Sequence, residues 1–352
     1  MDPGRLAQWC LEHLGSPPAG EIFTSGYLSA VIGLRLADGR EVVVKVRPDS
    51  PRIAACVEVQ RRMFQAGYPC PQPLTGAAPL GCDVATAEAY VPGGATLPSA
   101  DHAAPAFAAA FAWLIRLAPR PAEVSTLDPA PSWAAWNHGG DGLWPCPEGR
   151  DVNLNEVAGA EWIDDAGRRA RDRLRASESN AVIGHCDWLA GNLRWRGDEL
   201  LVVHDWDSIT ADSEAVLVGF ASALYSTVSA DELATVEDTE RFLAAYSMRV
   251  GGSSAPANSN SRGRLASGPG PTTPSISTRS GSPSPHCPRV RLAIAFVVLA
   301  PARGGHERPC FGPMFRVGPI LVGVAGFEPT ASSSRTKRAT KLRHTPAATG
   351  PA

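Results

Sequence analysis

Two short stretches decide the fold of this chain: HCDWLAGN at residues 185–192 and VHDWD at residues 203–207. In the first, an asparagine follows an aspartate by five residues, and in the second, two aspartates flank a tryptophan. Phosphoryl transfer from ATP uses such a set, because it needs a carboxylate that accepts the proton of the substrate hydroxyl and oxygen ligands that hold Mg²⁺. The two stretches therefore predict a phosphotransferase site on one loop and the hairpin that follows it.

The acidic and amide residues of these stretches have separate predicted roles. Asp187 is the expected catalytic acceptor, which orients the attacking hydroxyl and takes its proton. Asn192 and Asp205 are expected to supply a neutral and a charged oxygen to Mg²⁺, a cation that prefers oxygen ligands. Asp207 is expected either to add a further contact to the metal site or to cap the next turn.

The two histidines leave an alternative open. His185 is expected to brace the loop through hydrogen bonds. However, His185, His204 and Asp205 also contain the donors of a transition-metal site, which would make the protein a metal-dependent hydrolase. A capped turn with surface acids and no catalytic role is the other alternative.

Lys45 is the only lysine among the first 250 residues, where arginine is otherwise used. A compact ammonium fits between the α- and β-phosphates of ATP, whereas a planar guanidinium fits badly. The alternative is an ordinary lysine at a strand end with its head in solvent. Taken with the downstream stretches, Lys45 is predicted to bind the phosphates.

Further candidates for the nucleotide site lie around Lys45. Glu58, on the helix predicted to follow, is its expected ion-pair partner, and the alternative is a surface charge paired with a neighbouring arginine. Gly26 and Ser29 lie in the turn between the first two predicted strands, where backbone N–H groups can cover phosphates. An ordinary hairpin turn explains these two residues equally well.

Helical spacing and alternation divide the first 250 residues into a strand-rich part and a mainly helical part. Helices are predicted at residues 4–14, 50–67 (with Ser50 as N-cap), 104–117, 161–177 and 214–249. Strands are predicted within 21–47 and at 84–91, 193–196 and 200–204. Residues 121–157 are predicted to be irregular, and Trp133, Trp136 and Trp144 within them either line the substrate or simply pack.

Charge is distributed unevenly along the chain. The net charge is -2, but residues 1–250 carry 20 basic and 33 acidic residues, whereas residues 251–352 carry 13 and 2. An acidic body argues against a nucleic-acid partner and favours a cationic small substrate. The eight cysteines show no C-x-x-C pair and indicate reduced thiols in a cytoplasmic protein.

Neither a secretory signal nor a membrane span is predicted. The longest apolar run, residues 292–300, is far shorter than the ~20 residues that a span needs. Residues 251–290 are dominated by Gly, Ser, Pro and Asn, a composition too poor in core formers to fold. We expect residues 251–352 to be a disordered tail, either the product of a frameshift near residue 250 or a genuine basic tail.

The two stretches together resemble the aminoglycoside phosphotransferase family, which is related to protein kinases and choline kinases. The family pattern H-G-D-x-x-x-x-N, followed by x-D-x-D/E, matches His185, Asp187, Asn192, Asp205 and Asp207. By this resemblance Asp187 is the catalytic base, and Asn192 and Asp205 bind magnesium.

The resemblance covers about residues 15–249 and includes Lys45 and Glu58 upstream. Residues 88–93 (EAYVPG) resemble the hinge that binds adenine through its backbone, which assigns Glu88 and Tyr90 to the nucleotide site. The implied fold is α+β and two-lobed, with ATP between the lobes. A small lobe with an antiparallel sheet is expected over 1–92, and a mostly helical lobe with the catalytic loop and acceptor site over 93–250.

Three departures from the family pattern stand out. Cys186 replaces a glycine, which would crowd the loop if that position needs a positive φ. The usual G-D-P-x-x-D-L is absent, and residues 214–220 stand in its place. The helices expected after Tyr246 cannot be supplied by the tail, so apolar surface is expected to be uncovered.

The sequence thus predicts an ATP- and Mg²⁺-dependent phosphotransferase that acts on a hydroxyl of a small molecule, either aminoglycoside-like or another hydroxylated metabolite. The alternative that we retain is a catalytically inert, nucleotide-binding remnant of such an enzyme, because the final helices are missing.

Overall fold

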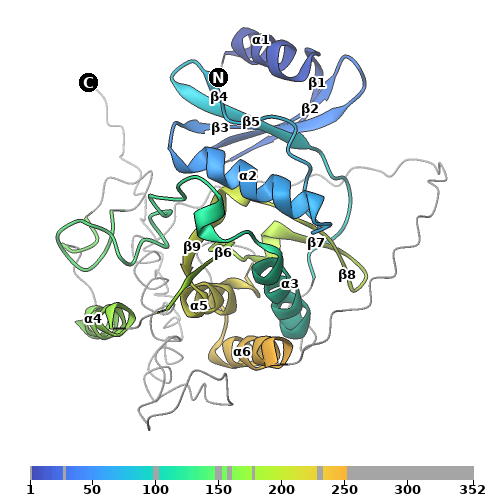
Figure 1. The fold of residues 1–352 in the computed structure, drawn as a ribbon. Helices are drawn as coiled ribbons and strands as arrows, with labels where there is room; N and C mark the ends of the chain where they lie inside the picture. Colours follow the sequence, from blue (N-terminus) through green and yellow to red (C-terminus); the bar gives the residue numbers. More distant parts are fainter. Residues whose placement is uncertain are drawn as a thin grey trace, which may run out of the picture.

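The computed structural model describes residues 2–26, 29–97, 103–146, 153–156, 161–176, 179–227 and 233–251. These residues form two lobes, one above the other (Figure 1). The predicted α+β, two-lobed fold is confirmed. The lobe boundaries at residues 92 and 250 stay predictions, and the expected tail lies, apart from Gly251, outside the described residues.

The upper lobe is an antiparallel sheet between two helices (Figure 1). Its five strands have the order β1-β2-β3-β5-β4. The strands are β1 (Pro18–Ser25), β2 (Ala30–Leu36), β3 (Glu41–Pro48), β4 (Ala78–Leu80) and β5 (Asp83–Ala89), and the helices are α1 (Pro3–Leu14) and α2 (Arg52–Gln65).

Alternation along β3 explains why this sheet has one apolar face and one charged face. Val42, Val44 and Val46 pack in a core cluster with α1 residues such as Trp9. The residues between them point to the other face, which is the side of α2 and the lower lobe (Figure 1). Lys45 and its neighbours on this face are therefore directed toward the junction of the two lobes.

The lower lobe is mainly helical, with two short β-ladders that carry the loops of the site. β6 pairs with β9, and β7 pairs with β8. The helices are α3 (Ala103–Leu117), α4 (Glu161–Arg175), α5 (Glu214–Leu224) and α6 (Val236–Gly251), and the strands are β6 (Ala181–His185), β7 (Leu193–Arg196), β8 (Glu199–Val203) and β9 (Ile209–Ser213). The 3₁₀ turns are η1 (Pro121–Glu123), η2 (Ala190–Asn192) and η3 (Trp206–Ser208). No helix in the described part of the chain is both long and apolar enough to cross a bilayer.

An aromatic cluster joins α3 to α6, the last described helix. Phe111 on α3 lies 5.0 Å from Trp188 and 6.4 Å from Phe242, between ring centroids. Phe242 is fully buried and also stacks against Tyr225, 5.1 Å away. The apolar face of α3 that faces α6 is therefore covered within the described chain.

Most predicted elements are present, with three differences. The predicted helix at 214–249 is two helices, α5 and α6. Ser50 is not the N-cap of α2, because that helix begins at Arg52 after Pro51, without a side-chain cap. The strands β4, β6 and β9 were not predicted, since these short segments become strands only through pairing, β4 with β5 and β6 with β9.

Replacing Phe242 by alanine should test the packing of α6. We expect F242A to lower the free energy of unfolding by about 3–5 kcal/mol, because it removes a fully buried ring from a close-packed cluster. Urea denaturation would measure this change. The control is F64A, whose ring is 40% exposed and whose loss should change stability by less than about 1 kcal/mol. Equal effects of the two substitutions would contradict the packing of α6 on α3.

Candidate functional site

The first decisive stretch forms a tight loop after β6. The Asn192 amide nitrogen donates to the Asp187 main-chain oxygen at 2.8 Å and to its carboxylate Oδ2 at 3.2 Å. Because the nitrogen faces Asp187, the amide oxygen of Asn192 is directed to the other side. The structure thus brings the predicted acceptor and the predicted neutral metal ligand together on one loop.

His185 braces this loop, as predicted. Its Nδ1 accepts the Asp187 backbone N–H at 3.2 Å, and its Nε2 lies 3.1 Å from the His204 carbonyl. These partners require a neutral ring with the proton on Nε2, and burial lowers the pKa of His185 in agreement. Both ring nitrogens are engaged by backbone groups, which argues against the transition-metal alternative.

The second stretch holds Asp205 in an unusual backbone conformation. Asp205 has φ 61° and ψ 50°, and it is the only described non-glycine residue with a positive φ. Its carboxylate accepts a 2.8 Å hydrogen bond from the Ser208 hydroxyl. Burial alone would raise the pKa of Asp205, but the positive charge of Lys45 and the Ser208 bond contribute to a net lowering. The structure therefore keeps this carboxylate ionised and within electrostatic reach of Lys45.

Lys45 is buried between the lobes. Its side chain is only 8% exposed, and its Nζ lies 3.5 Å from the Glu88 carboxylate on β5. Gln60 on α2 donates to the second Glu88 oxygen at 2.8 Å and to the Pro71 carbonyl at 3.0 Å. The alternative of a solvent-exposed strand-end lysine is wrong.

The predicted pairing of Lys45 with Glu58 is also wrong. Glu58 lies on the outer side of α2, where it accepts from Arg62 at 2.7 Å and from Arg61 at 3.2 Å. The side of α2 that faces the sheet instead presents the buried Gln60. Consequently, the carboxylate partner of Lys45 comes from the sheet, and Glu58 is a surface ion-pair residue.

In the predicted hinge, residues 88–93, the Glu88 side chain and the Tyr90 backbone N–H both have partners within the protein. The Glu88 side chain faces Lys45 rather than solvent. The Tyr90 backbone N–H donates to the Glu41 carbonyl at 3.1 Å, so this donor is already used within the protein. The Tyr90 ring lies 6.0 Å from the Phe23 ring on β1. Adenine binding along residues 88–93 stays a prediction.

The turn between β1 and β2 is described only at its ends. Gly26 has φ 136°, and a side chain there would meet the Ser29 carbonyl at 1.8 Å. The glycine is therefore required by a close approach of two backbone segments. A role of Gly26 and Ser29 in covering phosphates stays a prediction, since residues 27 and 28 lie outside the description.

Asp207 has a partner that the sequence did not suggest. Its carboxylate pairs with Arg47 of β3, and its carbonyl accepts from Arg52 at 2.6 Å. Neither predicted role, a metal contact or a turn cap, matches this geometry, because the carboxylate is directed to an arginine of the other lobe. Arg47, Arg52 and Gln60 are the interacting residues that sequence reasoning missed.

Cys186 does not crowd the loop that follows β6. It is fully buried, its backbone N–H donates to the Ser208 carbonyl at 2.9 Å, and its sulfur lies 3.1 Å from the same oxygen. Its φ is not positive. The expected conflict with the glycine of the family pattern is therefore wrong, and the side chain fills a small core cluster with Val216 and Phe220.

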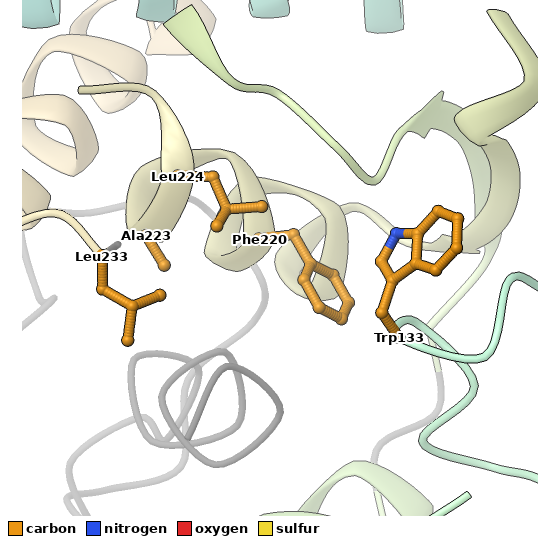
Figure 2. A pocket seen from close by; sticks show the side chains of 5 residues that line it. All are labelled: Trp133, Phe220, Ala223, Leu224 and Leu233. Carbon is orange, nitrogen blue, oxygen red and sulfur yellow. The ribbon is translucent and has the colours of Figure 1, made fainter. Parts of the chain in front are cut away.

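The tryptophans of the irregular stretch divide between packing and pocket lining. Trp144 is buried and donates to Asp164 at 2.7 Å, and Trp136 donates to Asp212 at 2.5 Å. Trp133 instead faces Phe220 across an apolar pocket along α5 (Figure 2), which is also lined by Ala223, Leu224 and Leu233. Packing thus accounts for Trp144, and Trp133 packs beside a small apolar pocket; a role of Trp133 in contacting the substrate stays a prediction.

The model of the phosphotransferase enzyme family matches residues 20–250. No curated protein matches the chain.

Several solved structures are similar to the chain at low identity. The amicoumacin kinase hAmiN, solved with AMP-PNP, Ca²⁺ and Ami, is 14% identical over 69% of this chain and 76% of its own, with a TM-score of 0.48. The aminoglycoside phosphotransferase APH(4)-Ia is 12% identical over 85% and 90%, with a TM-score of 0.47. The macrolide 2'-phosphotransferase MphH from Brachybacterium faecium is 16% identical over 69% and 82%, with a TM-score of 0.45.

The neutral histidines of the site predict that acid destabilises the fold. Burial, with help from the charges of Lys45 and Arg194, lowers the pKa of His204 from 6.5 to about 4. Between these two pH values the unfolded ring binds a proton that the folded ring does not. The free energy of unfolding should therefore fall as pH falls through this window, by at most roughly 1.4 kcal/mol per pH unit for one ring.

Urea denaturation at pH 7, 6 and 5 would measure this dependence. H204Q should weaken the dependence of the free energy of unfolding on pH, because glutamine does not titrate. The control, H13Q, replaces an exposed ring on α1 and should leave the profile as in the wild type. An H204Q protein that loses stability with acid as steeply as the wild type would contradict the assignment.

Proposed function

The chain belongs to the phosphotransferase enzyme family, and we propose that it transfers the γ-phosphate of MgATP to a hydroxyl of a small molecule. The observation that supports this most directly is that Lys45 and Arg47 share one face of β3, where Arg47 pairs with Asp207 of the turn that carries Asp205. Lys45 is buried beside Glu88 on this face, and its positive charge contributes to the lowered pKa of Asp205. A cation and a metal-binding carboxylate that converge in this way suit a triphosphate and its divalent ion.

The proposed roles follow from the donors that each residue presents. Asp187 accepts the proton of the attacking hydroxyl. Asp205, kept ionised, and the amide oxygen of Asn192 hold Mg²⁺, whose preferred ligands are oxygens. When bound, the metal neutralises charge that develops on the phosphate oxygens. Lys45 contacts the phosphates as a compact point charge.

In this proposal Glu88 positions Lys45. The Glu88 carboxylate is itself fixed by Gln60 at 2.8 Å, so the ammonium has a defined place before nucleotide binds. Preorganised charge is what electrostatic catalysis requires, because no reorganisation is then needed during the reaction. Glu88 therefore acts through the side chain of Lys45, in place of the adenine contact expected from the sequence.

The acceptor is proposed as a class only. A hydroxyl must approach Asp187, and the acidic body of residues 1–250 suits a cationic molecule. The inert-remnant alternative rests on helices expected after Tyr246, which lie, apart from the end of α6, outside the described residues, so the turnover measurement below decides it.

Replacing Asp187 by asparagine should test the proposed base. We expect D187N to lower turnover by about 10²- to 10⁴-fold, since the proton acceptor is lost, while MgATP binding is retained. ATP consumption over a panel of hydroxylated acceptors would measure turnover, and a thermal shift with MgATP would measure binding. The matched control is D198N in the exposed turn between β7 and β8. Undiminished turnover of D187N would refute the role.

Replacing Glu88 by glutamine should test the positioning of Lys45. We expect E88Q to weaken MgATP binding by roughly ten- to a hundredfold, the effect of losing one charge-assisted contact. The KM for the acceptor should not change. The control is E41Q, which removes the carboxylate that pairs with Arg35 at the sheet surface. Equal nucleotide affinities of E88Q and wild type would exclude Glu88 from this function.

A further inference from the structure

Two arginines of the upper lobe converge on the turn that carries Asp205. Arg47 comes from the end of β3, and Arg52 is the first residue of α2. Both reach across to η3 and the start of β9 in the lower lobe. Neither belongs to the predicted site.

Arg47 binds the turn through its side-chain charge. It lies two residues beyond Lys45, on the same face of β3, and is almost fully buried. Its guanidinium pairs with the Asp207 carboxylate and donates to the Thr86 hydroxyl at 2.7 Å. A buried charge of this kind persists only when it is paired, so the pair ties β3 to the turn.

Arg52 binds the same turn through its backbone. One guanidinium nitrogen donates to the Asp207 carbonyl at 2.6 Å, and the other donates to the Ile209 carbonyl. One helical turn later, the buried sulfur of Cys56 lies 3.9 Å from each of these oxygens. The planar fork of arginine matches two oxygens at a fixed separation, which a lysine cannot do.

The turn held in this way contains the strained residue of the site. Asp205 has a left-handed backbone, with φ 61°, which costs free energy for a residue other than glycine. Such a conformation persists only where the surroundings impose it. Within the turn, Ser208 contributes a backbone bond to the Asp205 carbonyl at 3.0 Å and a hydroxyl bond to its carboxylate.

We infer that Arg47 and Arg52 form an inter-lobe clamp that holds the Asp205–Ser208 turn and thereby positions the Asp205 carboxylate. The clamp itself follows from the contacts alone, and its consequence for metal binding rests on the proposed function. Arg47 and Arg52 are positioning residues, because they act on the metal only through the turn. The same contacts make the geometry of the metal site depend on how the two lobes are joined.

The test uses the full chain with the substitutions R52K and R47M. R52K keeps the charge and loses the fork, so it perturbs folding least, and R47M removes the ion pair. The matched control is R35K, since Arg35 also forks onto a partner, Glu41, but at the exposed surface of the sheet. Circular dichroism would establish that each variant is folded.

Hydrogen exchange is the first measurement, and it needs no ligand. We expect the amides of residues 206–210, including the Ser208 N–H that bonds to Asp205, to exchange faster by about tenfold in R52K and R47M. R35K should leave them unchanged. Wild-type exchange of these amides in R52K would overturn the clamp, whether or not R47M folds.

The second measurement separates positioning from a purely structural role. The Mg²⁺ concentration that half-maximally strengthens ATP binding should rise by about 10- to 100-fold in R52K, as for other residues that orient a metal ligand. ATP binding in EDTA should be unchanged. Faster exchange with an unchanged Mg²⁺ requirement would overturn the positioning role. If the wild-type protein bound MgATP but phosphorylated no acceptor, the result would count against the proposed phosphotransferase activity. Both measurements would still test the clamp, because neither requires turnover.

Discussion

The burial of Lys45 is the constraint on which the rest of the site depends. An ammonium removed from water is strongly destabilising unless carboxylates surround it. Here Glu88 lies 3.5 Å away in the same sheet, and the Asp205 carboxylate from the other lobe responds to the same charge. The cation therefore pairs within the sheet and also acts electrostatically on the turn that carries Asp205.

The charged face of β3 is the means by which the fold delivers this cation. Val42, Val44 and Val46 anchor one face of the strand in the core beneath α1, so the residues between them must project toward the lower lobe. Lys45 and Arg47 occupy consecutive positions on that face. Lys45 pairs with Glu88 and Arg47 binds Asp207, so a single strand carries both the cation proposed to contact the nucleotide and the arginine that holds the Asp205 turn.

Sequence reasoning found the elements and the loop residues but not the contacts between lobes. The pairs Asp187–Asn192 and Asp205–Ser208 are local, and spacing within the two stretches was enough to suggest the first. The partner of Lys45 was misassigned, although the pattern of α2 held the answer: Glu58, Arg61 and Arg62 fall on one side of the helix, away from its buried residues. The pairing of Glu88 with Lys45 and the contacts of Arg52 could not be found in this way, because the distance along the chain to their partners carries no periodic signal.

The strained backbone of Asp205 follows from the same demand for convergence. In the proposed site the Asp205 carboxylate must approach both a metal and a lysine of the opposite lobe, and an ordinary strand end, with its alternating side chains, would not direct it there. The left-handed turn redirects the Asp205 carboxylate. A glycine would adopt this backbone conformation at a lower cost in free energy, but a glycine has no carboxylate to present. The turn is therefore stabilised from outside, by hydrogen bonds and charges of the upper lobe. The features least favourable for stability alone, a buried lysine and a left-handed aspartate, thus occur together where the two lobes meet.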